Sequence, residues 1–314
     1  MKAIRIHGRG GPDHLVHLVY EDAPQPHPVP GEVLVRVYAT GLIANELRWS
    51  ETYETKAGSK RVLPIPGRDL SGVVEEVGPG VTTLTKGSAV YAMLAYGRDG
   101  AEADYTIALP GELAPKPRTL DYVQAAAVPL TALTAWQALF DHASLVAGQT
   151  VLIHGAAGGV GVFVVQLAHW AGAHVIATAS ARNRDFLREL GANEIIDYTI
   201  TRFEEVVHDV DLICDTVGGD TLQRSWQVIK SGGVLVSIVS PPPTADVAKG
   251  YDVRFVWFVV EPNRDELVQI GELIDAGHLW PIIDTVFPLA QACQAYEQGA
   301  KGHTRGKIVL RVVE

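Results

Sequence analysis

The stretch TVLIHGAAGGVG at residues 150–161, followed by VFVVQLAHWAG at 162–172, decides the fold of this chain. An apolar run that stops at a cluster of small residues and continues into a helical pattern predicts a buried strand, a tight turn and a helix. Gly158 would let backbone approach a pyrophosphate, and Gly161 would let the helix pack closely on the strand. The helix N–H groups then face the phosphates. The pattern predicts a dinucleotide-binding turn in which Ala156 replaces the usual first glycine.

The length and composition favour a soluble protein of two domains. At 314 residues the chain exceeds the size at which a single core usually stops growing. Its 47% of hydrophobic residues are spread over short segments, so no transmembrane helix is expected. The N-terminal MKAIRIHGRGG lacks the apolar region of a signal peptide, which argues against export. A formal charge of -10 opposes nucleic-acid binding, because phosphates demand a basic surface.

The two cysteines, Cys214 and Cys293, have no metal-type spacing. Each lies in an apolar segment, so both are expected to be buried free thiols. Without a disulfide framework, the reducing cytoplasm is the expected location.

From residue 121 onward, strand and helix patterns alternate. Strands are predicted at 150–155, 174–179, 194–198, 211–216, 233–239 and 253–260, with helices at 159–171, 183–190 and 220–229. Continuous Val/Ile/Leu strands between amphipathic helices indicate a doubly wound parallel sheet, hence an α/β fold. An apolar strand at 253–260 would be a liability on a sheet edge, so we expect it to pair with another subunit in a homodimer.

The first 120 residues have a different pattern. Short alternating segments at 32–39, 70–78 and 87–94 are separated by Pro and Gly, which predicts antiparallel β structure in a partly open barrel. After residue 261 the pattern predicts two helices and a final strand, GKIVLRVVE, that returns to the first domain.

Six motifs along the chain resemble those of a known superfamily. They are PGRDLSGVVEEVGPGV (66–81), PLTALTAWQAL (129–139), VLIHGAAGGVG (151–161), LGANEIIDY (190–198), DTVGG (215–219) and GHTRGKIVL (302–310). In this order they resemble the medium-chain dehydrogenase/reductase superfamily, specifically its zinc-free quinone oxidoreductase branch, over nearly the whole chain. The resemblance implies a GroES-like catalytic domain at 1–120 and 261–314 around a Rossmann domain at 121–260.

The same resemblance bears on metal binding. Zinc-dependent members carry a catalytic Cys in the segment aligned with ATGLIANEL, a His-Glu pair in that aligned with PGRDLSG, and a structural lobe with four Cys. Here residues 40–42 are Thr, Gly and Leu, Arg68 and Asp69 occupy the second region, and no cysteine precedes Cys214. Zinc needs N, S or O ligands around one point. We therefore expect no metal.

The end of the second predicted strand indicates the cofactor. NAD-preferring folds usually place Asp or Glu there, about 20 residues after the glycines. This chain has Ala179 and Ser180 instead, and Arg182 and Arg184 follow. A carboxylate would repel a 2′-phosphate, whereas a hydroxyl and positive charge would bind it, so NADPH is expected. By resemblance, Arg184 matches a phosphate-binding position, as does Tyr198.

Further cofactor-binding positions follow from the turn and from the resemblance. Those of the turn are Ala157, Gly158, Gly159 and Val160. Those implied at the nicotinamide end are Thr134, Val217, Ser240, Phe258, Val260 and Lys307. For the apolar members, packing at the ends of strands is an equally direct explanation.

The substrate-facing rim is expected at residues 42–53. Glu46 matches an acidic position of relatives, although Ile43 stands where many have Asn. Trp49, Tyr53 and Trp257 could stack on a flat ring, and Tyr53 could protonate an enolate. Each aromatic could instead fill the rim, and Glu46 could be a structural ion-pair partner.

Three functions remain open. The cofactor carries the hydride chemistry, and a site without zinc favours acceptors that need little activation. The first candidate is therefore an NADPH-dependent reductase of a quinone or similar conjugated carbonyl. The second is an enone, 2-alkenal or enoyl-thioester double-bond reductase. The third is a catalytically weak NADPH-binding sensor or structural protein.

Overall fold

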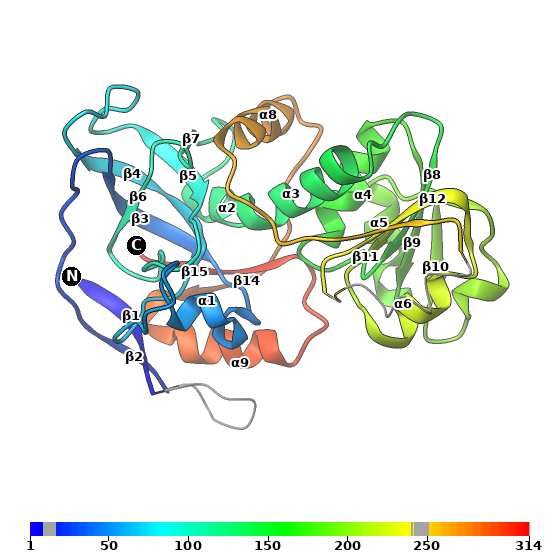
Figure 1. Ribbon diagram of the computed structural model, residues 1–314, viewed down its shortest axis with the longest axis horizontal. Helices are drawn as coiled ribbons and strands as arrows, with labels where there is room; N and C mark the ends of the chain where they lie inside the picture. The colour runs from blue at the N-terminus through cyan, green and yellow to red at the C-terminus, as the bar shows by residue number, and fades with distance from the viewer. Residues whose placement is uncertain (9–16, 240, 242–250, 314) are drawn as a thin grey trace. The chain divides into compact units, whose positions relative to one another are not determined.

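The computed structural model describes residues 1–8, 17–239, 241 and 251–313. The chain divides into two compact units, Met1–Leu130 with Glu261–Glu314, and Thr131–Val260 (Figure 1). The boundary expected at residue 121 therefore lies at 131. The reason is local packing, because helix α2 (Tyr122–Ala126) buries Ala126 in an apolar cluster with Ala39 and Val309 of the first unit.

The second unit is built on a six-stranded parallel sheet, which confirms the expected doubly wound fold. Its strands in spatial order are β10 (Glu194–Asp197), β9 (His174–Ala179), β8 (Thr150–His154), β11 (Val210–Asp215), β12 (Ile229–Ser237) and β13 (Arg254–Trp257). In sequence terms this order is 3-2-1-4-5-6, the dinucleotide-binding arrangement. The order reverses between β8 and β11, so ligands of this fold bind at the carboxyl ends of these two strands.

Helices α4 (Gly161–Trp170), α5 (Arg184–Glu189) and α6 (Gly219–Ser225) connect these strands. Nearly all of α4 is buried, as expected of a helix that is apolar all round. Leu222 and Trp226 from α6 and the turn after it pack in one cluster with Leu152, Ile213 and Leu235 of the sheet. At the start of the unit, α3 (Pro129–Trp136) continues into a π-helix, Gln137–His142.

Two expected elements end several residues earlier than the sequence pattern suggested. The strand expected at 253–260 contains only Arg254–Trp257, because β12 offers pairing partners only for these residues, from Val234 to Ser237. The helix expected at 220–229 ends at Ser225. Beyond it, Trp226 enters the core and Ile229 already pairs with Val210, so side-chain packing and strand pairing override the helical pattern.

The first unit is mainly antiparallel β structure. Its larger sheet has the order β14 (Ile283–Pro288), β15 (Lys307–Arg311), β3 (Val33–Gly41), β4 (Asp69–Val77), β5 (Ala89–Met93) and β7 (Ala114–Pro115), and β6 (Tyr105–Ala108) also pairs with β3. Strands β1 (Lys2–His7) and β2 (His17–Asp22) form a separate pair. The expected return of the final strand is confirmed, since β15 pairs antiparallel with β3.

Besides α2, the described part of the first unit contains the helices α1 (Ser50–Tyr53), α8 (Arg264–Asp275) and α9 (Ala292–Ala300). Cys214 is buried as expected, but Cys293 on α9 is exposed. The expectation for Cys293 was wrong because the helix buries Ala292, Ala295 and Tyr296 and turns position 293 outward.

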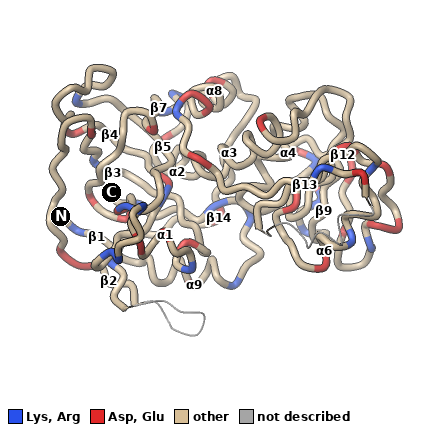
Figure 2. The backbone as a smooth tube through the Cα atoms, in the orientation of Figure 1, with Lys and Arg blue, Asp and Glu red and all other residues tan. Residues whose placement is uncertain are grey.

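Acidic and basic positions are interspersed along both units (Figure 2). Within the described ranges, no helix is long and apolar enough to cross a membrane.

Candidate functional site

The turn between β8 and α4 has the close geometry that a dinucleotide-binding turn requires. Gly155 has a φ of +70°, which residues with a side chain rarely adopt. A Cβ on Gly161 would lie 2.3 Å from the Gly155 carbonyl oxygen and 2.7 Å from the Ala156 Cα. Only glycine therefore lets the helix begin this near the strand, which confirms the packing role expected of Gly161.

The surface of this turn fits a pyrophosphate. Residues 157–160 are partly exposed, and a Cβ on Gly158 would have the Gly155 carbonyl oxygen, at 3.3 Å, as its nearest neighbour. No described side chain caps the start of α4 at Val160. The N–H groups of Gly158 and Val162 already donate to the carbonyl oxygens of Gly155 and Gly158, each at 3.0 Å. The predicted phosphate contacts therefore fall on the other backbone groups of Ala157, Gly158, Gly159 and Val160.

The residues expected at a 2′-phosphate come from two neighbouring strands. Ala179 of β9 is the partner of Asp197 of β10, so Ser180 and Tyr198 leave the sheet at the same level. Tyr198 is 52% exposed. Hydrogen bonds from Thr199 hold the pKa of Asp197 below its usual value, and the nearby charge of Arg184 acts in the same direction. Arg182 and Arg184 are both exposed.

Sequence reasoning missed Asp215, which organises the loop after β11. Its Oδ1 accepts hydrogen bonds from the Val217 and Gly218 N–H groups at 3.0 and 2.9 Å, and its Oδ2 accepts one from the Ser237 hydroxyl at 2.8 Å. The loop presents Val217 with 54% of its surface exposed. Only the DTVGG motif could have pointed to Asp215, and its partner on β12 is remote in sequence.

His154 is a second missed residue, at the carboxyl end of β8. Its ring nitrogens contact the hydroxyls of Thr178 at 3.1 Å and Ser225 at 3.0 Å, which joins β8 to β9 and α6. Burial lowers the pKa of His154 to about 4, so the ring is neutral at physiological pH. His154 therefore braces the strand that carries the glycine turn.

The remaining predicted residues of the second unit differ in exposure. Thr134 is buried on α3, and Val260 is buried at the end of the unit. Phe258 packs on His142, with ring centroids 4.3 Å apart, and Trp257 is 44% exposed. Ser240 lies outside the described residues.

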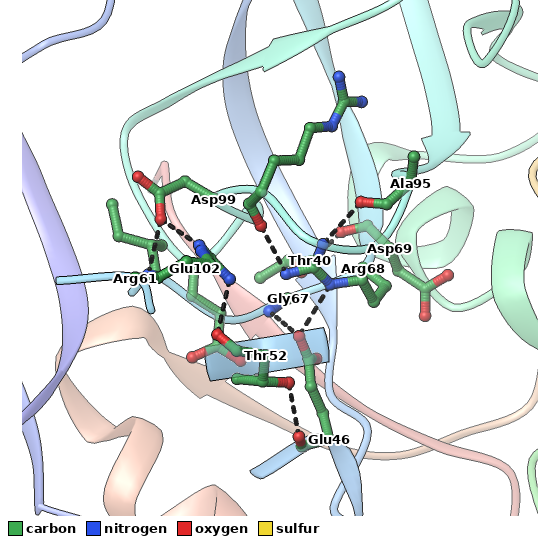
Figure 3. A network of polar contacts seen from close by, with 12 residues as sticks. Thr40, Glu46, Thr52, Arg61, Gly67, Arg68, Asp69, Ala95, Asp99 and Glu102 are labelled. Carbon is green, nitrogen blue, oxygen red and sulfur yellow. Dashed lines mark hydrogen bonds and ion pairs between the residues drawn. The ribbon is translucent and has the colours of Figure 1, made fainter. Parts of the chain in front are cut away.

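In the first unit, Glu46 is the centre of a buried polar network (Figure 3). It lies in a short 3₁₀ helix, Glu46–Arg48, after β3. Its Oε1 accepts hydrogen bonds from the Arg68 Nε at 2.9 Å and from the Gly67 N–H at 3.0 Å. Both charged side chains are almost fully buried, at 0% and 1% exposed. Of the two roles open for Glu46, the geometry supports the structural ion pair.

Lys307 is also held in a buried ion pair rather than extended from the surface. Its ammonium lies 2.9 Å from the Asp69 carboxylate, and both side chains are buried. The other Asp69 oxygen accepts a hydrogen bond from the Leu130 N–H at 2.7 Å. A Cβ on Gly41 would lie 2.6 Å from Asp69 Oδ2, so this glycine makes room for the pair.

Tyr53 has its hydroxyl engaged within the protein. The group donates a hydrogen bond to the Leu47 carbonyl oxygen at 2.7 Å. Burial raises the pKa of Tyr53, and the charge of Glu46 adds to the shift. Both effects hold the proton on Tyr53, which makes it a poor acid in this conformation. Glu46, Trp49, Tyr53 and Lys307 belong to the first unit, and the other predicted site residues belong to the second.

Glu102 extends the buried network of the first unit. Its Oε1 accepts a hydrogen bond from the Tyr296 hydroxyl at 2.7 Å, while its Oε2 has no partner among the described residues. Burial, together with the charge of Glu46, raises the pKa of Glu102 to about 8. Glu102 thus carries its proton at neutral pH.

The raised pKa of Glu102 predicts a pH-dependent gain in stability for Glu102→Gln. A carboxyl group whose pKa is higher in the native state than in the unfolded state stabilises the native state fully at pH values below its unfolded pKa, near 4.5. This contribution is lost as the pH rises through the native pKa of about 8. Glutamine keeps an acceptor for Tyr296 and has no charge to bury. We expect Glu102→Gln to raise the free energy of unfolding by about 3–4 kcal/mol more at pH 8 than at pH 5, at about 1.4 kcal/mol per unit of pKa difference. Urea denaturation at both pH values measures this, and equal effects would contradict it.

Together, the parallel sheet with its glycine turn defines a dinucleotide-binding α/β protein with a second, mainly antiparallel unit. Comparison with known families agrees. The family described as alcohol dehydrogenase GroES-like domain matches residues 29–118, and the one described as zinc-binding dehydrogenase matches residues 190–310.

Individual proteins are similar over nearly the whole chain. A probable zinc-binding oxidoreductase, mitochondrial, of Arthroderma benhamiae is 38% identical over 92% of each chain. The NADPH-dependent alkenal/one oxidoreductase, chloroplastic, of Arabidopsis thaliana is 33% identical over 89% of this chain and 72% of its own. The solved structure of the quinone oxidoreductase from Coxiella burnetii covers 99% of both chains with 33% identity and a TM-score of 0.88.

The chain therefore belongs to the medium-chain dehydrogenase/reductase superfamily, as its motifs suggested. It is an oxidoreductase that uses a nicotinamide dinucleotide, with a GroES-like first unit and a Rossmann-like second unit.

Proposed function

We propose that this chain is an NADPH-dependent reductase of a quinone or a similar electron-poor conjugated carbonyl, and that it works without a metal. The observation that carries the proposal is the buried Glu46–Arg68 pair. It lies in the region where zinc-dependent members carry metal ligands. When bound, the cofactor supplies a hydride, and the protein has to hold, orient and shield the reactants.

The preference for NADPH is supported by the end of the second strand of the parallel sheet. Ser180, Arg184 and Tyr198 supply hydroxyls and a cation there, and no carboxylate follows β9 directly. A guanidinium binds phosphate oxygens in a planar, charge-assisted geometry. The same groups give little to a ribose 2′-hydroxyl.

The proposal of a metal-free site follows from the chemistry of the residues present. Arg68 is a permanent cation and cannot be a zinc ligand. Asp69 is already neutralised by Lys307. Within the described part of the chain, no three His, Cys, Asp or Glu side chains lie together in a group that could hold a metal. Without a Lewis acid, acceptors that take hydride readily are favoured.

A second candidate, reduction of an enone or 2-alkenal double bond, is favoured by the Arabidopsis relative, whose name states that activity. Both candidates deliver hydride to a conjugated carbonyl system. They differ in the shape of the acceptor rather than in the cofactor.

The decisive experiment measures NADPH oxidation against a panel of quinones, 2-alkenals and enoyl thioesters. We expect turnover with quinones first, full activity in protein dialysed against a chelator, and a kcat/KM for NADPH about tenfold or more above that for NADH. Saturable NADPH binding without turnover would instead identify a binding protein. Stoichiometric zinc in the dialysed protein would overturn the metal-free site.

Arg184→Ala tests the cofactor assignment, with Arg188→Ala on the same helix as the matched control. Arg184→Ala should raise the KM for NADPH about tenfold and leave that for NADH unchanged. Arg188 is exposed and pairs with Asp185, so its loss should change neither value. Equal effects of Arg184→Ala on both cofactors would contradict the assignment.

The proposal includes a second copy of the chain as partner. Strand β13 is the last strand of the parallel sheet, and its edge carries the exposed Trp257, followed by Val259 at 55% exposed. None of the described strands pairs with this edge of β13, and such an edge is a template for a strand of another chain. Sedimentation of a monomer at micromolar concentration would remove this part of the proposal.

A further inference from the structure

Tyr96 lies in the loop between β5 and β6, near the residues expected at the substrate rim. Its ring packs edge-on against Trp49, with centroids 5.9 Å apart and an angle of 71° between the planes. The side chain is partly exposed, and its hydroxyl has no hydrogen-bond partner among the described residues. The Tyr53 hydroxyl, by contrast, donates a hydrogen bond to the Leu47 carbonyl oxygen.

Arg68 holds the loop on both sides of Tyr96. Its Nη1 donates to the Ala95 carbonyl oxygen at 2.8 Å (Figure 3), and its Nη2 donates to the Arg98 carbonyl oxygen at 3.0 Å. The Nε is bound to Glu46 at the same time. The rigid, planar guanidinium therefore fixes the two ends of a four-residue loop relative to each other.

A second carboxylate, that of Glu112, also binds the loop that carries Tyr96. Glu112 accepts hydrogen bonds from the Ala95 N–H at 3.1 Å and the Leu109 N–H at 2.9 Å, and it forms an ion pair with Arg98. Gly97 has a φ of +76°, and a Cβ there would lie 2.9 Å from the backbone nitrogen of Lys56. The loop is thus held in one conformation, and the position of the Tyr96 ring is set by it.

Burial raises the pKa of Tyr96, against the opposing charge of Arg68. The phenol stays protonated at physiological pH and remains a hydrogen-bond donor.

We propose that Tyr96 binds the substrate, donating a hydrogen bond from its hydroxyl to the carbonyl oxygen of the quinone or conjugated ketone, while the Glu46–Arg68 pair positions it. This inference rests on the proposed function. Negative charge develops on the carbonyl oxygen as the acceptor is reduced, and a hydrogen-bond donor in a fixed position stabilises that charge. Arg68 is then a positioning residue, which acts through the loop.

Tyr96→Phe tests the donor, with Tyr20→Phe as the matched control because Tyr20 is an exposed tyrosine on β2. With 1,4-naphthoquinone and 2-cyclohexen-1-one as acceptors, Tyr96→Phe should lower kcat/KM about tenfold or more. The Kd for NADPH and the unfolding midpoint should not change. Tyr20→Phe should behave as wild type. Values for Tyr96→Phe within about twofold of wild type with both acceptors would overturn the proposal.

A mutant cycle that combines Tyr96→Phe with the double variant Glu46→Leu/Arg68→Met tests whether the Glu46–Arg68 pair positions Tyr96. The double variant removes the pair without leaving a lone buried charge. If the pair acts through Tyr96, the double variant should lose kcat/KM about as Tyr96→Phe does, and adding Tyr96→Phe to it should cause little further loss. Fully multiplicative losses would show that the pair does not position Tyr96.

Quinone binding separates failure of this inference from failure of the proposed function. Quenching of tryptophan fluorescence by 1,4-naphthoquinone is measured in protein saturated with NADP⁺. If wild type binds the quinone without turnover and Tyr96→Phe weakens that binding about tenfold, the donor role stands and the reductase function fails. If wild type neither binds nor reduces the quinone, both fail.

Discussion

Glu46→Ala is expected to lower the free energy of unfolding by about 3–5 kcal/mol, because it leaves a buried guanidinium without its counter-charge. Arg68 is 1% exposed and has Glu46 as its ion-pair partner. Its remaining hydrogen bonds go to the carbonyl oxygens of Ala95 and Arg98, which carry no full charge. Urea denaturation at pH 7 measures the loss.

The control for this prediction is Glu46→Leu/Arg68→Met, in which both charges are removed together. Apolar replacement of a buried pair is often nearly neutral, since the cost of desolvating two ions disappears with their attraction. The double variant should therefore be more stable than Glu46→Ala alone. If the free energy of unfolding of Glu46→Ala lay within about 1 kcal/mol of the wild-type value, the Glu46–Arg68 pair would contribute little to folding.

Gly161→Ala is expected to lose about 3 kcal/mol of stability and nearly all NADPH binding. The added Cβ would lie 2.3 Å from the Gly155 carbonyl oxygen, a backbone atom that cannot rotate away. Either the helix moves from β8 or the turn changes shape, and overpacking of this kind costs about 1–3 kcal/mol or more. Thermal unfolding and NADPH titration by fluorescence measure the two losses.

Gly158→Ala is the matched variant, because the same methyl group meets a different environment there. Its nearest protein atom is 3.3 Å away, so the cost to folding should be about 1 kcal/mol or less. The methyl group would, however, occupy the surface that a pyrophosphate approaches, and NADPH affinity should fall about tenfold or more. If both variants lost stability equally, or if Gly158→Ala bound NADPH normally, the account of the turn would be wrong.

Local patterns predicted most of the fold. Strand β9 has the predicted bounds, β8 ends one residue before its predicted end, and β11 lies one residue earlier in the chain than predicted. These strands are buried on both faces, so their apolar runs are unbroken and easy to recognise. Prediction failed at 226–229 and 258–260, where strand pairing and core packing with distant residues decide where an element ends.

The candidate site was predictable to a smaller degree. The glycine turn depends on neighbours in sequence, so Gly158 and Gly161 could be identified from it. Glu46 and Lys307 matched positions of relatives. No local pattern, however, shows that Glu46 pairs with Arg68 or that Lys307 pairs with Asp69. Tyr96 was missed because its loop has no regular pattern.

The sequence by itself determined the dinucleotide turn, the parallel sheet around it and the resemblance to the medium-chain dehydrogenase/reductase superfamily. All three depend on residue types at short, regular spacings, which follow from backbone geometry. Only the tertiary structure decided which charges are buried together and which hydroxyls have partners. Arg68 meets Glu46 across 22 residues, and Tyr296 meets Glu102 across 194. Such contacts arise from packing of whole elements, which no single segment encodes.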